Sequence, residues 1–122
     1  MKFFHRGAIV YVDLNPAKGH EQAGKRPALV ISNDKLDWSR SKLVTVLPIT
    51  TRERELWTRI AVDPREGGLK ERSWVIGEQV RTISTERIID VWGNVRPPTI
   101  AAVEKVLRFL FALRSAPGAA ND

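Results

Sequence analysis

The proline pair at Pro97 and Pro98 divides the chain into two parts with different hydrophobic periods. Proline disfavours helix in the residue before it but fits the first turn of a helix. Downstream of the pair, apolar residues recur at helical spacing: Ile100, Val103, Leu107, Leu110 and Phe111. We therefore expect one amphipathic helix over Pro98 to Arg114. Further apolar residues widen its surface beyond one packed face and indicate a contact with another subunit: Val106, Phe109 and Leu113.

Upstream of the prolines, short β-branched and apolar segments alternate with polar stretches that contain glycine or proline. The first segment, Gly7 to Leu14, is expected to place Ala8, Val10, Val12 and Leu14 on one face of a strand. Pro48 cannot donate to a ladder, so it is predicted to mark a sheet edge or a strand end. The remaining predicted strands are Ala28–Ser32, Leu43–Ile49, Leu56–Val62, Ser73–Arg81 and Asp90–Val95, with a short helical turn over Ser84–Arg87.

These elements predict a mainly β fold with a C-terminal α-helix, built as a small, strongly bent antiparallel sheet or open barrel. With 122 residues and 43% hydrophobic composition, the chain fits one compact domain over 1–114, followed by a disordered tail over 115–122. No apolar run approaches the roughly 18 to 20 residues that cross a bilayer. The N-terminus also lacks the small-residue cleavage site of a signal peptide, so we expect a cytoplasmic protein without membrane contact.

The composition restricts the chemistry. The chain has no cysteine, which excludes disulfides and thiolate nucleophiles, and its two histidines are too few for most metal sites. We therefore expect no metal and no cofactor. Lys and Arg number 20 against 14 Asp and Glu, a net charge of +6 that favours a polyanionic partner, either nucleic acid or an acidic protein.

The polar stretch from Lys18 to Pro27 is predicted to form a long loop between the first two strands. Arg26 stands directly before Pro27, whose ring favours extended backbone, so its guanidinium leaves a defined position and is suited to clamp a phosphate. An exposed ion pair between Glu21 and Arg26 explains the same residues without any function.

Three segments occur in a familiar order: Asp13–Pro16 with Lys18–Pro27, then Val46–Thr51, then Val75–Ile83. Together they resemble the MazF/PemK family of toxin endoribonucleases, the mRNA interferases of type II toxin–antitoxin systems. The likeness extends from Arg6 to about Leu113. The resemblance implies an SH3-like barrel, MazF/PemK/CcdB-like, that forms a homodimer and is inhibited by an acidic, MazE-like antitoxin. Its implied substrate is single-stranded RNA, the mRNA of the cell, whose cleavage inhibits translation and growth.

By this resemblance Arg26 and Thr50 are catalytic, and Glu21 is the loop carboxylate beside them. Cleavage through the 2′-hydroxyl leaves a 2′,3′-cyclic phosphate and a 5′-hydroxyl, and it needs a base, an acid and positive charge rather than a metal. Glu21 is the candidate base; the acid stays open between Arg26, His20 and solvent. Predicted RNA-binding residues are His20, Gln22, Lys25, Thr51, Arg52, Arg54, Glu78, Gln79 and Arg81.

Two departures from the family pattern are His20, where many members carry serine, and Ile76, where one branch has an arginine. Glu78 shares a strand face with Ile76, so either its pKa is raised among apolar neighbours or the strand bends there.

Three tryptophans in strand patterns are predicted to lie in the core or an interface: Trp57, Trp74 and Trp92. Trp38, in a polar stretch, is the candidate for stacking on a base.

Two other functions remain open at this level. The related CcdB toxins share the fold and act by protein contact with gyrase, without catalysis. A general RNA-binding barrel would use the same cations only to hold phosphates. The presence of Glu21, Arg26 and Thr50 together favours the nuclease.

Overall fold

The computed structural model describes residues 3–35 and 38–114, apart from the side chain of Trp38, and this part contains seven strands. The strands are β1 (Ala8–Asp13), β2 (Lys25–Val30), β3 (Leu43–Thr50), β4 (Arg59–Val62), β5 (Ser73–Ile76), β6 (Arg81–Ser84) and β7 (Ile88–Asn94). The helices are α1 (Trp38–Ser41), η1 (Glu66–Gly68), η2 (Thr85–Arg87) and α2 (Pro97–Leu110), where η denotes a short 3-10 helix. The predicted mainly β fold with a C-terminal helix is confirmed. The predicted tail, 115–122, lies outside the described residues.

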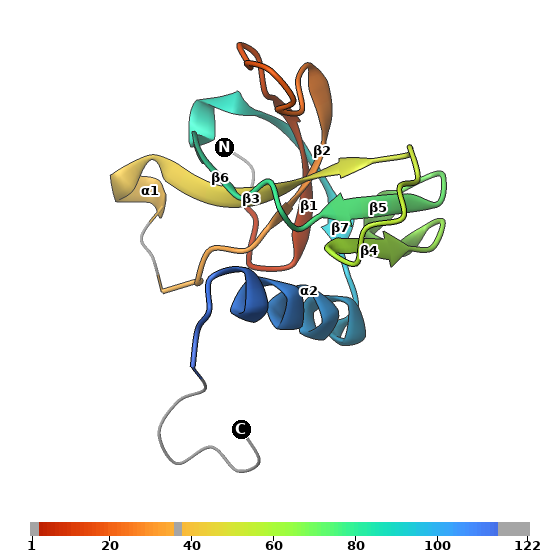
Figure 1. The fold of residues 1–122 in the computed structure, drawn as a ribbon. Coiled ribbons are helices and arrows are strands. Elements are labelled where there is room, and N and C mark those ends of the chain that lie inside the picture. Colours follow the sequence, from red (N-terminus) through yellow and green to blue (C-terminus); the bar gives the residue numbers. More distant parts are fainter. Residues whose placement is uncertain (1–2, 36–37, 115–122) are drawn as a thin grey trace.

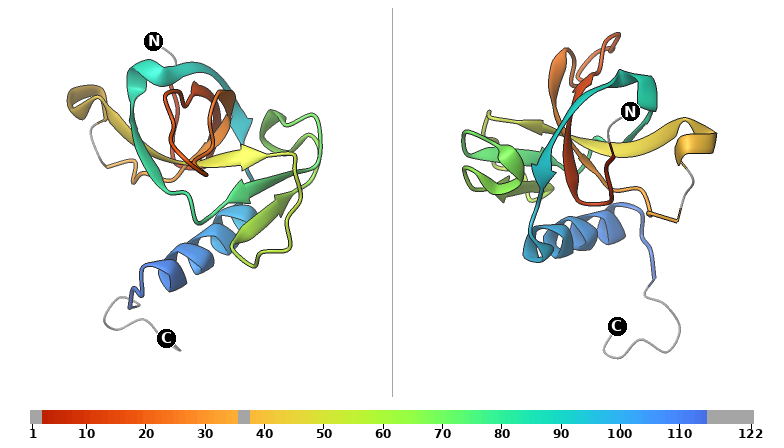
Figure 2. Two further views of the ribbon diagram at one scale, coloured as in Figure 1. Left: turned by 45° about the horizontal axis from the view of Figure 1, so that its top comes forward. Right: turned by 180° about the vertical axis from the view of Figure 1, so that it is seen from behind.

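All strand pairs are antiparallel, in the order β4-β5-β3-β2-β1-β7, and β6 also pairs with β3. Figure 1 shows the strands curled around one another with α2 lying across one side. In the left view of Figure 2, β6, η2 and β7 arch around the ends of β1 and β2. The sheet is therefore the strongly bent, open barrel that the sequence predicts. In the described part of the chain, no helix is long and apolar enough to span a membrane.

Strand β3 changes its partner along one edge, because its first half pairs with β6 and its last two residues pair with β5. The carbonyl of Thr45 accepts a hydrogen bond from the N–H of Ile31, so the backbone polar groups of Thr45 face β2. These groups face alternate sides along a strand, so those of Pro48, three residues later, face the side of β3 on which β6 and β5 lie. There β3 has left β6 and has not yet met β5, so the missing N–H of proline costs no ladder bond. The predicted strand end at Pro48 is wrong, since β3 continues to Thr50, but the predicted edge is present locally, because Pro48 is paired with Ala28 on one side only.

The central strands β1, β2 and β3 are buried on both faces. The predicted face of β1 is confirmed, and it belongs to a cluster enclosed by the barrel: Phe4, Ala8, Val10, Val12, Leu14, Ala28, Val30, Val44, Val46 and Ile83. The opposite face carries Ile9, Leu29 and Leu47, which pack with β4, β5 and α2 in a second cluster. Because both faces of these strands are buried, their sequences are almost continuously apolar. An alternating pattern of apolar and polar residues is therefore absent, and the sequence does not reveal that the second face is also buried.

Helix α2 begins one residue earlier and ends four residues before its predicted bounds. Val103 and Val106 are its buried residues, so Val106 belongs to the packed face rather than to a surplus surface. The prediction that Leu110 and Phe111 complete the packed face is wrong, because they are 37% and 55% exposed. Figure 2 shows the physical reason: the C-terminal end of α2 extends past the strands and has no sheet to cover.

Two predicted boundaries change at the segments that carry candidate site residues. The predicted strand Ser73–Arg81 is divided into β5 and β6 by a turn at residues 77–80, so the alternative of a bend at Glu78 is correct. The predicted loop Lys18–Pro27 is shorter, because its last three residues belong to β2 and pair with β1. Both changes bring polar side chains to strand ends.

The tryptophans contribute less to the core than predicted. Trp57 is 60% exposed and makes an edge contact with Phe109, with ring centroids 4.7 Å apart. Trp92 is 39% exposed and stacks on Tyr11, and Trp74 is half-buried on β5. A core role is therefore wrong for Trp57 and Trp92. The side chain of Trp38 lies outside the described part, so its stacking role stays a prediction.

Candidate functional site

Arg26 and Thr50 lie at neighbouring strand ends. The β2–β3 ladder ends with Ala28 opposite Pro48. Two residues further along, beyond the last pair of this ladder, Arg26 of β2 and Thr50 of β3 are on the face of the sheet that carries Ala28, because side chains alternate along a strand. Residues from separate sequence segments thus lie toward the same end of the β2–β3 pair.

Arg26 is half-buried near the start of β2, opposite Val12. Its Nε donates to the carbonyl oxygen of Ala23 at 3.0 Å, which orients the guanidinium. Within residues 3–35 and 38–114, neither Nη1 nor Nη2 has a hydrogen-bond partner, so this edge is open to donate two parallel bonds to an anion. Burial lowers the pKa of Arg26 from its ordinary value, but a guanidinium stays cationic at neutral pH.

Thr50 is the last residue of β3 and is half-buried opposite Trp74 of β5. Its Oγ1 accepts the backbone N–H of Arg52 at 3.1 Å. No described residue accepts the hydroxyl proton, which leaves it to donate to a ligand. Thr50 thus supplies one neutral hydrogen-bond donor at the end of β3.

Glu21 is held by its own loop. Its Oε1 accepts the N–H of Lys18 at 2.8 Å, and its N–H donates to the Lys18 carbonyl at 3.1 Å. The carboxylate stays exposed. In the described part of the chain Glu21 makes no ion pair with Arg26, so the alternative of a simple exposed pair is not supported.

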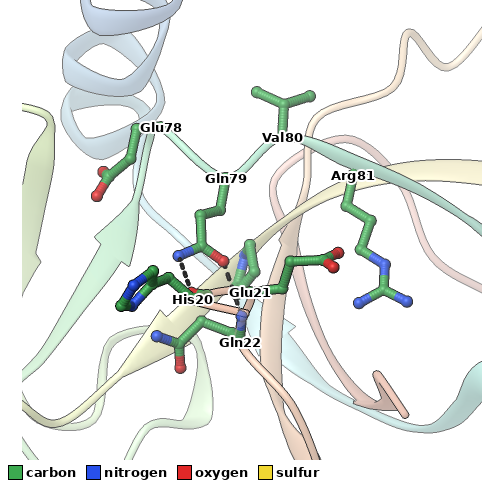
Figure 3. Close-up of a pocket in the computed structure, with 8 residues that line it drawn as sticks. His20, Glu21, Gln22, Glu78, Gln79, Val80 and Arg81 are labelled. Atoms are coloured by element: carbon green, nitrogen blue, oxygen red, sulfur yellow. Dashed lines mark hydrogen bonds between the residues drawn. The ribbon is translucent and has the colours of Figure 1, made fainter. Parts of the chain in front are cut away.

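A pocket of about 390 Å³ opens between this loop and the β5–β6 turn (Figure 3). Gln79 extends across it: its Oε1 accepts the N–H of Gln22 at 2.9 Å, and its Nε2 donates to the carbonyl of His20 at 3.2 Å. Figure 3 shows the Glu21 carboxylate and the Arg81 guanidinium on the same side of Gln79. The lining residues are His20, Glu21, Gln22, Pro48, Glu78, Gln79, Val80 and Arg81.

A second pocket, of about 400 Å³, shares four of these lining residues: His20, Gln22, Glu78 and Gln79. It adds Thr50, Arg52, Arg54 and Arg59. The two pockets adjoin at this shared wall, and we call the pair, which extends from Arg81 past Gln79 to Thr50, the groove. Arg52 and Arg54 are exposed at its far end, so both ends of the groove carry positive charge.

Glu78 is engaged by a cation that the sequence reasoning missed. Arg59, whose side chain is only 5% exposed, donates from Nη2 and Nε to Oε2 at 2.8 and 2.9 Å, and Thr58 Oγ1 donates to Oε1 at 2.8 Å. Partial burial pushes the pKa of Glu78 up, but the hydrogen bonds from Arg59, from its own backbone and from Thr58, with the charge of Arg59, lower it overall. The alternative of a raised pKa is therefore wrong.

Alternation in the predicted run Leu56–Val62 puts Arg59 on the face opposite the apolar residues, where it looks like an ordinary surface cation. Its partner Glu78 follows 19 positions later on another strand's end. No local pattern links the two, so only the pairing of β4 with β5 could reveal the ion pair.

Arg81 borders the groove at the start of β6, opposite Val46. Its Nη2 donates a long 3.5 Å hydrogen bond to the carbonyl of Pro16, and its Nη1 is buried without a partner in the described part of the chain. A buried, unpaired donor of a cation is costly unless a ligand or water completes it. Arg81 is thus positioned to donate a hydrogen bond to an anionic or carbonyl oxygen.

The structure brings together at this groove nine of the candidate residues and leaves three outside the pocket walls, namely Arg26, Lys25 and Thr51. Lys25 and Thr51 are exposed and line neither pocket. Each is the chain neighbour of Arg26 or Thr50, and neighbouring side chains in extended backbone point to opposite sides. Arg26 lines neither pocket and stands near the start of β2, next to the end of β3 that carries Thr50. No group of three His, Asp or Glu side chains that could hold a metal ion is present among residues 3–35 and 38–114.

Residues 5–111 match the protein family described as PemK-like, MazF-like toxin of type II toxin–antitoxin system. The chain belongs to this family. The resemblance inferred from the three sequence segments is therefore confirmed, and the match spans all three of them.

Among its relatives, the toxin is 32% identical over 108 residues to endoribonuclease MazF9 of Mycobacterium tuberculosis, covering 84% of this chain and 92% of that protein. It is 31% identical over 109 residues to endoribonuclease EndoA of Bacillus subtilis, covering 88% and 94%. Both relatives are endoribonucleases by name, which confirms the predicted class of enzyme.

Solved structures show the same fold. MazF of Deinococcus radiodurans superposes with a TM-score of 0.80 at 23% identity, over 92% of this chain and 99% of that chain. A mycobacterial endoribonuclease in complex with its cognate antitoxin gives a TM-score of 0.73 at 23% identity, over 93% and 100%. The predicted MazF-like barrel is thereby confirmed.

Proposed function

We propose that this toxin cleaves single-stranded RNA by attack of the 2′-hydroxyl on the adjacent phosphorus, without a metal ion. The bond to the 5′-oxygen breaks, and the products are a 2′,3′-cyclic phosphate and a 5′-hydroxyl. The observation that supports this most directly is that Arg26, with an open Nη edge, and Thr50, with a hydroxyl proton left to donate, stand at neighbouring ends of β2 and β3, where Thr50 lines the groove. Attack increases the negative charge on the phosphoryl oxygens, and fixed donors there stabilise the transition state.

In this proposal Arg26 is the cation that stabilises the pentacoordinate phosphorus, because its Nη edge is open while its Nε is fixed to Ala23. The Thr50 hydroxyl donates a hydrogen bond to a phosphate oxygen. Glu21 takes the proton of the 2′-hydroxyl. Its exposed carboxylate, held by the Lys18 turn, is suited to that role. The leaving 5′-oxygen takes up a proton from one of the three open donors, Arg26, His20 or solvent.

The groove is the proposed path of the RNA. Arg52 and Arg54 at one end and Arg81 at the other contact the backbone phosphates, and Lys25 and Thr51 contribute at the rim. His20 and Gln22 belong to the wall shared by the two pockets, and we place the unstacked bases against these two side chains. Such a shaped path accepts some sequences better than others, so we expect discrete cut sites.

The test is incubation of the purified toxin with one long RNA in EDTA, followed by mapping of the cut ends and their terminal groups. Wild type should give discrete cuts with cyclic phosphate ends. Arg26→Ala and Thr50→Ala should each lose about 10²- to 10³-fold in rate, the cost of one preorganised donor. Arg96→Ala is the matched control, because Arg96 is exposed, lines neither pocket, and its side chain has no partner in the described part of the chain.

The outcomes separate the possibilities. If either site variant cuts within a few-fold of wild type, the site assignment fails. If wild type binds RNA but does not cut it, the protein is a binding barrel. If it neither binds nor cuts, it acts by protein contact, as the CcdB-like alternative predicts.

We further propose that the protein partner is an acidic, MazE-like antitoxin whose segment lies in the groove. The cations at both ends of the groove suit an anionic peptide as well as an RNA backbone. Folding on contact lets a short disordered segment cover a large surface.

We propose also that the toxin forms a homodimer through the apolar patch at the end of α2. The patch has a pocket of about 430 Å³ lined by Trp57, Lys105, Val106 and Phe109. Phe109 is 71% exposed, and Trp57 packs against its ring. Three more large apolar side chains are exposed at this end: Leu110, Phe111 and Leu113. Exposed clusters of this kind typically mark protein interfaces.

A further inference from the structure

We infer that Gln79 is a positioning residue that holds the Glu21 loop in its working geometry, rather than a side chain that reads RNA. This inference rests on the proposed function of the loop. It begins from the two hydrogen bonds that tie the Gln79 amide to the backbone on either side of Glu21, at Gln22 and His20.

The orientation of the amide is determined by the loop. A backbone N–H can only donate, so the atom facing Gln22 must be the oxygen; a carbonyl can only accept, so the atom facing His20 must be the nitrogen. Both ends of the amide are therefore engaged by main chain in the absence of RNA. The Gln79 side chain thus accepts one hydrogen bond from the loop backbone and donates one to it.

The turn that carries Gln79 is itself fixed to the body of the protein. Gly77 N–H donates to the Thr58 carbonyl at 3.0 Å, and a Cβ at this glycine would lie 2.5 Å from that oxygen, closer than any side chain allows. The next residue, Glu78, is held by Arg59 and Thr58. Val80 packs against the core cluster that α2 covers.

These contacts make a continuous path from the core to the loop. The Gly77 backbone and the Glu78 carboxylate fix the turn. The Gln79 amide, bonded to His20 and Gln22, then restricts the backbone on both sides of Glu21. The loop has few other fixed points near its tip: the carboxylate of Glu21 bonds only within its own turn, to Lys18. Without Gln79 the carboxylate would sample more positions, and small displacements of a base strongly reduce the rate of its step.

The experiment compares Gln79→Met, which keeps the length and removes both hydrogen bonds, with wild type by amide hydrogen exchange without RNA. Exchange at Gln22 should become about two- to tenfold faster, the range that one net hydrogen bond supports. The amide of Leu14, which donates to Gly24 at the base of the loop, should not change. Gln22→Met is the matched control: its backbone bond remains, so exchange at position 22 should stay slow.

On RNA, Gln79→Met should lower kcat about ten- to a hundredfold with KM and the set of cut sites unchanged. Gln79→Asn, one methylene shorter, reaches only one of the two partners and should fall between. Unchanged exchange at Gln22 would overturn the inference, as would equal acceleration at Leu14. Altered cut sites with kcat preserved would show that Gln79 reads bases. If wild type cuts no RNA, the proposed function fails, while the exchange result still tests the loop contact.

Discussion

Replacing Glu78 by glutamine should destabilise the fold, because Arg59 would keep a buried charge without its counter-ion. The Arg59 side chain is 5% exposed and that of Glu78 is 29% exposed. Breaking a fully buried pair costs about 3–5 kcal/mol. Water reaches the Glu78 side, and glutamine keeps one acceptor, so we expect a loss of about 2 kcal/mol in the free energy of unfolding at neutral pH.

The pH dependence follows from the lowered pKa of Glu78. A carboxyl that is more acidic when folded contributes stability above its unfolded pKa, and loses it as the pH falls through the folded value. The difference between wild type and Glu78→Gln should therefore be constant from about pH 8 to pH 5.5. It should shrink below the ordinary pKa of 4.5, since protonated Glu78 and glutamine are both neutral.

Urea unfolding followed by circular dichroism at several pH values measures both quantities. Glu86→Gln is the matched control, because Glu86 is exposed and no ion pair of its side chain is present in the described part of the chain. It should change stability by less than about 0.5 kcal/mol. A difference for Glu78→Gln below that figure, or one that persists unchanged at pH 3, would refute the account of this ion pair.

Three further predictions concern packing, assembly and inhibition. Gly77→Ala should destabilise by about 1–3 kcal/mol in urea, since its Cβ would lie 2.5 Å from the Thr58 oxygen and 2.9 Å from Val106; an unchanged midpoint contradicts the close approach. Wild type should have a dimeric mass by light scattering at micromolar concentration, and Phe109→Ser should shift it toward monomer; a monomeric wild type rejects the proposed interface. Inhibition by the antitoxin should be competitive with RNA and weaken as salt rises; an antitoxin that leaves binding of a short, uncleavable RNA unchanged acts elsewhere.

Much of the fold could be predicted because its signals are local. The alternation of β1 and the helical period after Pro97 depend only on neighbouring residues, and both predictions were confirmed. The ordered segments around Arg26, Thr50 and Glu78 were sufficient for the family. Their roles in RNA cleavage stay predictions, which the proposed variants test.

The contacts that complete the groove depend on pairing between distant segments. Gln79 and Gln22 are 57 positions apart, and Arg59 and Glu78 are joined only through the β4–β5 hairpin. Pro48 is tolerated inside β3 only because the strand changes partners there. Composition and period thus determined which segments become strands, helix and polar loop, since those depend on local sterics and burial. The tertiary structure alone decided which donors meet which acceptors at the groove, because register and strand order set those distances.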